Sequence, residues 1–360
     1  MSFVIYGAGS CGRDVRQGLE DSGERVLGFL DCVREEPIDV LSCVHPASEQ
    51  ATRWRESGAR VVIAIWNPCA PIDEIEDELK AAGWAQVENF PRLRERYSGA
   101  LGTRFWIGGH AANYQNPQTQ RFIEEARRLW SDDKSRELFE IWLRARQDLD
   151  LAPLNRAWRE EGSTQYFPRD VEGWPREIFS FVDCGAYDGD TLRELKQQLP
   201  DSEIAYYGFE PDKLNFERLS QEARTPQPHG APSTYRCALW PCGVWHETLM
   251  LSFENSGLAS SALAEGGSVL VPVVALDEVL QGVPIQVLKM DIEGAEPHAL
   301  RGARRLISAQ RPCLALCLYH SPEHLWSLPL MLDSWRLNYK FFLRAHAANG
   351  FDWICYAVPS

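Results

Sequence analysis

The sequence has no excess of basic residues, no long apolar run and no paired cysteine motif. Its 37 lysines and arginines are outnumbered by 51 aspartates and glutamates, which gives a formal net charge of −14. Because an acidic surface repels phosphate backbones, we expect no nucleic-acid partner. No apolar stretch approaches the roughly 20 residues that a membrane helix requires, so we also expect no membrane anchor.

The ten cysteines are scattered along the chain, and none forms a C-x-x-C pair. Cys237 and Cys242 are five positions apart and Cys313 and Cys317 are four apart, spacings that match no common zinc site. Several cysteines lie inside apolar runs, as in PCLALCLY, which is typical of small buried side chains in a reducing compartment. The chain begins directly with the strand-like run FVIYG, so we expect no signal peptide and a cytoplasmic protein.

The length of 360 residues favours two domains, and the hydrophobic periodicity changes along the chain accordingly. Over residues 1–105, short apolar runs alternate with helical segments, which predicts a small parallel sheet with crossover helices. Residues 106–176 contain stretches with apolar residues three and four apart, so we expect a helical linker region there. From 177 to 360 the alternation of strands and helices resumes.

Seven strands are expected in the C-terminal part, at 178–183, 204–209, 234–238, 285–290, 313–318, 339–345 and 352–358. Helical segments separate the first five, which predicts a doubly wound, mostly parallel sheet. Only the short segment AHAANG joins the last two, so these should pair as an antiparallel hairpin. The expected fold class is therefore α/β, with two Rossmann-like domains and a helical bridge between them.

A glycine-rich segment, GAGSCG, follows the first expected strand and opens a helix. Gly7, Gly9 and Gly12 fit the G-x-G-x-x-G pattern, and Asp31 ends the next strand, where an acid can bind a ribose. This fingerprint predicts a nucleotide, NAD or a nucleotide-sugar as one ligand of the N-terminal domain. No second catalytic cluster accompanies it, and the alternative is a Rossmann-like domain that serves dimerisation or substrate presentation without a ligand.

A second glycine-containing loop, VDCGAYDGDT, follows the first strand of the C-terminal part, with Asp183 ahead of Gly185 and Gly189. Glycines let the backbone approach a ligand closely, and the helix that begins near Thr191 offers N–H groups suited to a carboxylate. Glu210 ends the next strand, where its carboxylate can accept hydrogen bonds from a ribose diol. The combination predicts an adenosine site; a loop used only for packing and a solvated strand-end carboxylate are the alternatives.

Three carboxylates, Asp291, Glu293 and Glu296, follow the strand VLKM within six residues. Such a cluster is costly unless it binds something, so it should position a substrate hydroxyl, hold Mg²⁺ through Asp291 and Glu293, or cap the next helix. Lys289 lies two residues before Asp291. His320 ends the fifth strand, and the ordinary pKa of histidine makes it a candidate general base, with helix capping as the alternative.

In this order, VDCGAYDGDT, YGFEPD, YRCALW and KMDIEGAEPHALRGARRLI resemble the FkbM family of methyltransferases over about residues 178–320. The resemblance implies a class I methyltransferase domain with a seven-stranded, mostly parallel sheet, S-adenosylmethionine as methyl donor and methylation of a hydroxyl oxygen. By position, Asp183 and Gly185 match the family's cofactor loop, Glu210 matches its ribose-binding acid, and Asp291, Glu293 and Glu296 match its signature strand end. We expect the cofactor contacts to come from Asp183, Gly185, Ala186, Tyr187, Asp188, Thr191, Glu210, Pro211, Ala238 and Asp291. The expected catalytic residues are Asp291, His320 and Lys289, and the expected substrate contacts are Glu293 and Glu296. Many relatives carry asparagine where this chain has Tyr187-Asp188, a departure that concerns the side-chain contacts of the loop rather than its backbone.

The main functional hypothesis is an O-methyltransferase that acts on a sugar or another polyhydroxylated metabolite, which is a small-molecule or glycan acceptor. In this hypothesis Asp291 and His320 orient and deprotonate the acceptor hydroxyl, and most of the rate comes from alignment. Two further hypotheses stay open: a bifunctional or regulated enzyme whose N-terminal domain binds NAD or a nucleotide-sugar, and a non-catalytic nucleotide-binding protein. Selectivity for the acceptor is expected in loops such as 252–267.

Overall fold

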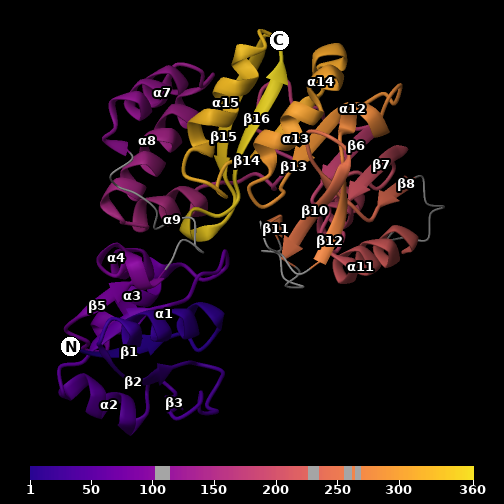
Figure 1. Ribbon diagram of the computed structural model, residues 1–360. Helices are drawn as coiled ribbons and strands as arrows, with labels where there is room; N and C mark the ends of the chain where they lie inside the picture. Colours follow the sequence, from indigo (N-terminus) through magenta and orange to yellow (C-terminus); the bar gives the residue numbers. More distant parts are fainter. Residues whose placement is uncertain (102–113, 226–234, 255–261, 264–268) are drawn as a thin grey trace. The chain divides into compact units, whose positions relative to one another are not determined.

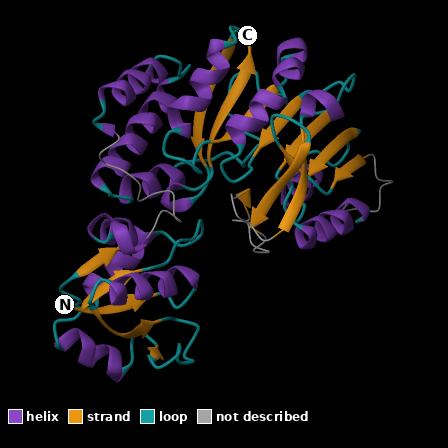
Figure 2. Ribbon diagram, in the orientation of Figure 1, coloured by secondary structure: helices purple, strands orange, loops and turns teal. Residues whose placement is uncertain are grey.

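The computed structural model of the 360-residue chain describes residues 1–101, 114–225, 235–254, 262–263 and 269–360. The chain divides into two compact units, each of which gathers segments that are distant in the sequence. The first unit comprises Met1–Gln120, Glu137–Glu161 and Ala345–Asp352, and the second comprises Arg121–Arg136, Gly162–Arg344 and Trp353–Ser360. In both units strands and helices are mixed, so the fold is α/β (Figure 2).

A five-stranded parallel sheet forms the centre of the first unit. Its order is β3 (Cys43–Val44), β2 (Arg25–Leu30), β1 (Ser2–Tyr6), β4 (Arg60–Ile63) and β5 (Val87–Asn89) (Figure 1). The helices of this part are α1 (Ser10–Asp21), α2 (Glu49–Glu56), α3 (Ile72–Ala81), α4 (Phe90–Arg96) and α5 (Ser98–Leu101). Apolar side chains of β1, β2 and β4 pack with those of α1 and α4 in one buried cluster. The strand order changes direction between β1 and β4, as in nucleotide-binding folds.

Three helices, α7 (Pro117–Arg127), α8 (Asp133–Asp148) and α9 (Ala152–Arg159), occupy the region expected to be helical. The start of α8 is capped by Asp132, whose carboxylate accepts a hydrogen bond from the backbone N–H of Ser135 (2.8 Å). A short acidic side chain at this position satisfies N–H groups that the first helical turn leaves unpaired.

Seven strands form the large sheet, most of which belongs to the second unit. Its order is β15 (Tyr339–Ala345), β16 (Trp353–Pro359), β14 (Cys313–Cys317), β13 (Val287–Met290), β6 (Ser180–Cys184), β7 (Ile204–Phe209) and β8 (Tyr235–Trp240) (Figure 1). The strands from β14 to β8 pair in parallel, whereas β16 is antiparallel to β14, so the sheet is mixed. The seven strands expected from the sequence are all present, and no end differs from the expected one by more than two residues.

The last two strands are neighbours in this sheet, joined by a connection that contains only the short helix η2 (Ala348–Gly350). His346 N donates to Asp352 O, and Ser360 N donates to Asn338 O. The start of one strand thus pairs with the end of the other, which is the pattern of an antiparallel pair. The helices of the second unit are α10 (Asp190–Gln198), α11 (Lys213–Arg224), α12 (Leu276–Val279), α13 (Glu296–Gly302), α14 (Arg304–Gln310) and α15 (His324–Ser334).

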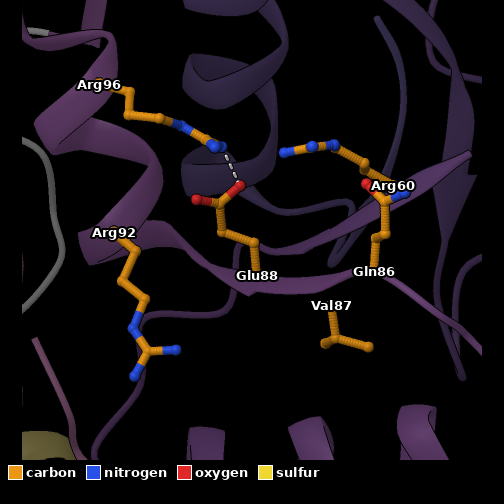
Figure 3. Close-up of a pocket in the computed structure, with 6 residues that line it drawn as sticks. All are labelled: Arg60, Gln86, Val87, Glu88, Arg92 and Arg96. Carbon is orange, nitrogen blue, oxygen red and sulfur yellow. Dashed lines mark hydrogen bonds and ion pairs between the residues drawn. The ribbon is translucent and has the colours of Figure 1, made fainter.

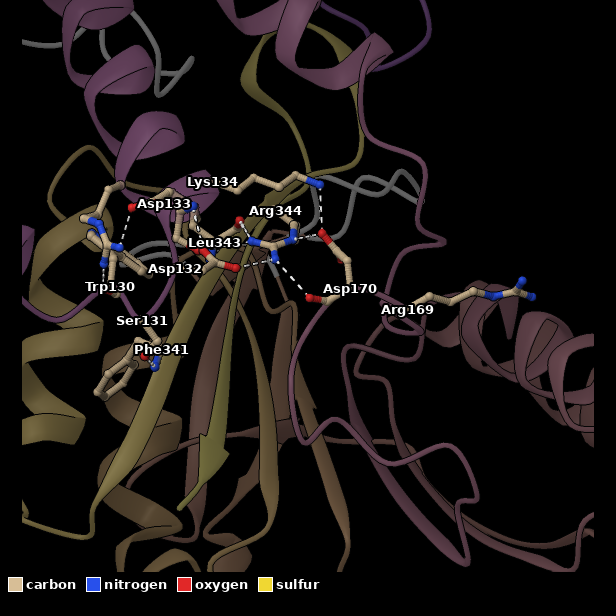
Figure 4. A network of polar contacts seen from close by, with 12 residues as sticks. Trp130, Ser131, Asp132, Asp133, Lys134, Arg169, Asp170, Phe341, Leu343 and Arg344 are labelled. Atoms are coloured by element: carbon tan, nitrogen blue, oxygen red, sulfur yellow. Dashed lines mark hydrogen bonds and ion pairs between the residues drawn. The ribbon is translucent and has the colours of Figure 1, made fainter.

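A buried arginine connects β15 to the start of α8 and to the segment before β6. The Arg344 side chain is only 1% exposed, and it forms ion pairs with Asp132 (2.7 Å) and Asp170 (2.8 Å) (Figure 4). Ser135 Oγ accepts from Arg344 Nη1 (3.1 Å) and from Leu343 N (2.8 Å). A buried guanidinium is tolerated when such partners satisfy its charge and its N–H groups.

A second, smaller sheet was not expected from the sequence. It lies between β8 and α12 in the chain, and its order is β11 (Ala262–Leu263), β10 (Leu249–Glu254), β12 (Val269–Val274) and β9 (Gly243–Val244). Val271 and Val273 form its buried side, whereas Met250 and Leu270 are exposed. The predicted selectivity loop at 252–267 lies largely outside the described residues.

All ten cysteines are free thiols, and seven of them are buried, as the apolar runs around them predict. Among the described helices, none combines the length and the apolar character needed to cross a bilayer.

Candidate functional site

The candidate site lies at the carboxyl ends of β6, β7, β13 and β14. These strands are parallel, so the loops that follow them meet at one edge of the sheet. The chain proceeds from β6 to one side of the sheet through β7 and β8, and later to the other side through β13 and β14. Ligands of open α/β sheets bind at such a reversal of strand order.

The loop between β6 and α10 is shaped by its backbone. Gly185 has a φ of +82°, and a Cβ at this position would lie 1.8 Å from the carbonyl oxygen of Asp291. The N–H groups of Gly185 and Ala186 both donate to Phe209 O at 3.0 Å. Glycine is therefore required where this loop touches the loop after β13, and the two candidate loops are in direct contact.

Glu210, at the end of β7, is joined to the same loop. Its Oε2 accepts from Tyr187 N (2.9 Å) and its Oε1 accepts from Asp212 N (2.8 Å). Burial raises the pKa of Glu210 to about 7, although these two backbone hydrogen bonds lower it. Each carboxylate oxygen can accept a further hydrogen bond, so the group is positioned to receive a diol.

Asp183 and Lys289 form a buried ion pair instead of facing a ligand. Lys289 Nζ lies 2.8 Å from Asp183 Oδ1 and donates to the carbonyl of Gly185 (2.6 Å), and the two side chains are 2% and 0% exposed. Tyr206 Oη donates to Asp183 Oδ2 (2.6 Å). Burial opposes the charge of Lys289, but the carboxylates of Asp183 and Asp291 outweigh it and raise the lysine pKa. We expected Asp183 to contact the cofactor and Lys289 to take part in catalysis. The structure corrects both roles: the two side chains are buried against each other, and Lys289 supports the Gly185 loop through its carbonyl group.

Asp291 is the central carboxylate of the site, and its side chain is 20% exposed. Tyr166 Oη donates to Oδ2 (2.9 Å), and Tyr319 Oη donates to Oδ1 (3.1 Å). Nε2 of His320 lies 3.3 Å from Oδ1. Burial alone would raise the pKa of Asp291, but the charges of Lys289 and His320 outweigh it and lower the pKa, so the group is an anion that accepts hydrogen bonds.

His320 is enclosed by carboxylates. Its Nδ1 lies 2.7 Å from Glu296 Oε1, and its Nε2 lies 3.7 Å from Glu293 Oε2. Burial lowers the pKa of His320, but Glu296, Glu293 and Asp291 raise it to about 10. The ring is therefore an imidazolium at neutral pH. This corrects the expectation of a histidine that titrates near neutrality, because a protonated ring cannot accept the proton of a hydroxyl.

Glu296 is fully buried and acts within the protein. Its Oε1 also accepts from Ile292 N (3.0 Å), and its Oε2 lies 3.5 Å from His324 Nδ1. Burial raises the pKa of Glu296, but the histidines outweigh it and lower the pKa. Glu296 thus fixes the turn into α13 and the orientation of His320, which is the capping alternative rather than a direct substrate contact.

Glu293 differs from Glu296 because 29% of its side chain is exposed. Its φ is +54°, a left-handed conformation that costs on the order of 1 kcal/mol or more for a residue other than glycine. Such conformations are concentrated at functional sites. Glu293 and Asp291 are therefore the two carboxylates of the signature that a ligand can reach.

The other residues expected to contact the cofactor differ in burial and in whether their side chains already have a partner. Asp188 pairs with Arg193 (2.6 Å), and Thr191 is buried at the start of α10, where its N–H donates to Asp190. Pro211 follows Glu210 at the same edge and is half-buried. Ala238 is half-buried inside β8, opposite Tyr207, two residues before the strand ends.

Two tyrosines of the site were not expected. Tyr166 lies in the turn-rich segment before β6, with a φ of +64°, and its ring also covers the Lys289 ammonium at 5.2 Å. No periodicity marks this segment, so the sequence offers no signal for it. Tyr319 adjoins His320 and could have been included, because residues at a strand end share the same edge of the sheet.

The donors around Asp291 bear on the Mg²⁺ hypothesis. Two hydroxyls and an imidazolium already point at its oxygens, and a cation would have to displace the imidazolium between Asp291 and Glu293. Over the described part of the chain, no group of three or more His, Cys, Asp or Glu side chains is arranged so that it could hold a metal ion. The residues present do not fit a divalent ion here.

The N-terminal fingerprint residues also come together at one edge of their sheet. Gly12 is required for packing, because a Cβ there would lie 1.9 Å from the carbonyl oxygen of Gly7. Asp31 Oδ2 accepts from Ala8 N (3.0 Å) inside the glycine loop, and Gly9 precedes α1 with open space beside its Cα. A ligand at this loop stays a prediction.

Residues 183–343 match the methyltransferase FkbM domain. A crystal structure of methyltransferase FkbM from Methylobacillus flagellatus KT has a TM-score of 0.77 and 20% identity, covering 99% of this chain and 89% of that one, and so shares its fold. The structure of the SAH-bound Podospora anserina methyltransferase PaMTH1 gives a TM-score of 0.28 at 10% identity, covering 70% of this chain and 99% of that one, too low to support an argument. No curated protein matches the sequence.

Proposed function

We propose that the chain is an S-adenosylmethionine-dependent O-methyltransferase with a class I fold, because residues 183–343 match the methyltransferase FkbM domain. The proposal rests above all on one observation: the Gly185 loop touches Asp291, and Glu210 is bonded to the same loop. In this proposal the nucleoside site and the acidic acceptor site share one edge of the sheet. The strand order around β6 and β13 supports the class I assignment.

The residues present fit the proposed cofactor. Gly185 lets the loop after β6 lie against the loop after β13, and the Glu210 carboxylate keeps acceptor capacity for a ribose diol. The start of α10 adds backbone N–H groups for a carboxylate. When bound, S-adenosylmethionine supplies a methyl group on a positively charged sulfur. The chain's own contribution is to hold this donor and to align an acceptor.

Asp291 and Glu293 are the groups proposed to align the acceptor. Both side chains are partly exposed, and as anions they accept hydrogen bonds from hydroxyl groups. The imidazolium of His320 holds the two carboxylates together, which lessens their mutual repulsion. The acceptor proton passes to a carboxylate or to water as its oxygen gains the methyl group. His320 is therefore a positioning residue in this scheme.

Hydroxyl-rich acceptors suit this pair of anions, whereas an acceptor with a carboxylate or phosphate near the reacting oxygen would be repelled. A sugar or another polyhydroxylated metabolite is accordingly the proposed acceptor class. The test is transfer of a tritium-labelled methyl group from S-adenosylmethionine to a panel of glycosides and polyols. Transfer that is lost in Glu293→Gln, but kept in the exposed control Glu217→Gln, is the expected outcome. Labelling only of amines or carboxylates would contradict the hydroxyl assignment.

A further inference from the structure

A basic pocket lies in the first unit, away from the glycine loop of that unit. It has a volume of about 370 Å³ and is lined by Arg60, Gln86, Val87, Glu88, Arg92 and Arg96 (Figure 3). Arg60 begins β4, Val87 begins β5, and Arg96 ends α4. The pocket is thus at the amino end of the parallel strands, whereas the glycine loop follows the carboxyl end of β1. No part of the dinucleotide fingerprint contributes to it.

The charges that line the pocket do not cancel. Glu88 forms an ion pair with Arg96, and it is the one carboxylate among the lining residues. No hydrogen bond or ion pair of the Arg60 guanidinium is found among the described residues, although its charge helps to lower the pKa of Glu24, which lies outside the lining. Figure 3 shows the guanidinium groups of Arg60 and Arg96 pointing toward one another on the two sides of Glu88. Within the lining, three guanidinium groups face one carboxylate, an excess of two positive charges in a chain whose net charge is −14.

The geometry of the lining side chains is held by the backbone around them. Gln86 O accepts from Val61 N (2.9 Å), which fixes the start of β5 beside β4. Arg92 Nε donates to Leu149 O (3.2 Å), which orients its guanidinium. The Gln86 amide adds a neutral donor and acceptor, and Val87 adds an apolar surface. Guanidinium groups suit phosphate and diphosphate groups, because one arginine can donate two parallel N–H hydrogen bonds to two oxygens of the same phosphate.

We propose that this pocket binds a small, multiply charged phosphate compound. The two positive charges that the lining leaves in excess provide the attraction, and the N–H groups of Arg60, Arg92 and Arg96 with the Gln86 amide provide the donors. The pocket would then form a second ligand site, separate from the proposed methyl-transfer site and independent of whether that proposal holds. Its volume suits a diphosphate with a small organic group rather than a long polymer.

Pyrophosphate is the probe that tests this inference, by isothermal titration calorimetry at low ionic strength with the full chain. We expect binding that weakens as salt is added. Arg60→Gln and Arg96→Gln should each lower the affinity about tenfold or more, the effect of losing one charge-assisted contact. Arg53→Gln is the matched control, because Arg53 is an exposed arginine of the same unit whose ion pair with Glu49 lies outside the pocket. That variant should bind like the unmodified chain.

The glycine loop is the competing location for pyrophosphate, and Gly9→Ala distinguishes the two. A Cβ at Gly9 meets nothing within 4 Å, so the variant should fold, yet the added methyl would obstruct a phosphate on the loop. Unchanged affinity in Gly9→Ala together with loss in Arg60→Gln supports the pocket. Absence of binding, full binding by Arg60→Gln, or loss confined to Gly9→Ala would each overturn the inference. Circular dichroism of every variant confirms that it is folded.

Discussion

The buried ion pair between Glu296 and His320 should make the stability of the fold depend on pH. Glu296 is 0% exposed, and its Oε1 lies 2.7 Å from His320 Nδ1. Glu296→Gln keeps the shape of the side chain and removes its charge. Glu296 is first among the carboxylates that raise the pKa of His320 to about 10, so this pKa should fall toward neutrality in the variant.

The size of the effect follows from the burial of both partners. Removing one member of a buried charge pair costs about 3–5 kcal/mol of unfolding free energy. The pKa of His320 in the folded protein is above its ordinary value of about 6.5. The pairing therefore contributes its full stabilisation below about pH 6.5. The stabilisation is lost as the pH rises toward about 10. At about 1.4 kcal/mol per pKa unit, the unmodified chain should lose a few kcal/mol over this range, and Glu296→Gln much less.

Urea unfolding followed by tryptophan fluorescence, between about pH 6 and pH 10, measures this difference. Glu217→Gln, which changes an exposed glutamate of α11, should reproduce the unmodified curve. Nitrogen NMR of the imidazole reads the charge of His320 directly. An unmodified His320 that titrates near the ordinary pKa, or a pH slope that Glu296→Gln leaves unchanged, would refute the reasoning.

Three further predictions follow from the described contacts. Arg344→Met removes the buried partner of Asp132 and Asp170, which are themselves partly exposed, so it should lower the unfolding free energy by about 1–3 kcal/mol in urea titrations; no measurable loss would contradict the role given to this network. Glu210 has a pKa of about 7, so affinity for S-adenosylhomocysteine should rise as the pH passes upward through that value, and calorimetry should find no such rise in Glu210→Gln. Gly12→Ala should lower the melting temperature because its Cβ would strike Gly7 O, whereas Gly9→Ala should not; equal melting temperatures would count against the packing role of Gly12.

Much of the fold could be predicted because strands buried on both faces are continuous apolar runs. FVIY, FVDC and VLKM read as strands without any knowledge of their neighbours. The ends of such strands then place Glu210 and Asp291 at one edge of a sheet, since parallel strands share their carboxyl edge. The small sheet β11-β10-β12-β9 was missed: no strand was expected between residues 238 and 285, and β9 and β11 have only two residues each.

The chemistry of individual side chains could be predicted less well, because it depends on partners distant in the sequence. Asp183 and Lys289 look like site residues by position, yet they neutralise each other. His320 looks like a base until Glu296 and Glu293 are placed around it. The position of a residue at a strand end therefore predicts that it lies at the site. Whether its side chain is protonated, and whether a ligand can reach it, is seen only in the structure. The domain limits drawn from the sequence stay a prediction.

The central claim is a cofactor site formed by the Gly185 loop and Glu210. Calorimetric titration with S-adenosylhomocysteine, for the unmodified chain, Glu210→Ala and Glu217→Ala, tests it most directly. The account predicts binding by the unmodified chain and by Glu217→Ala, and an affinity at least about tenfold weaker for Glu210→Ala, the effect of losing hydrogen bonds to a carboxylate. Absence of binding by the unmodified chain, or equal binding by all three proteins, would contradict it.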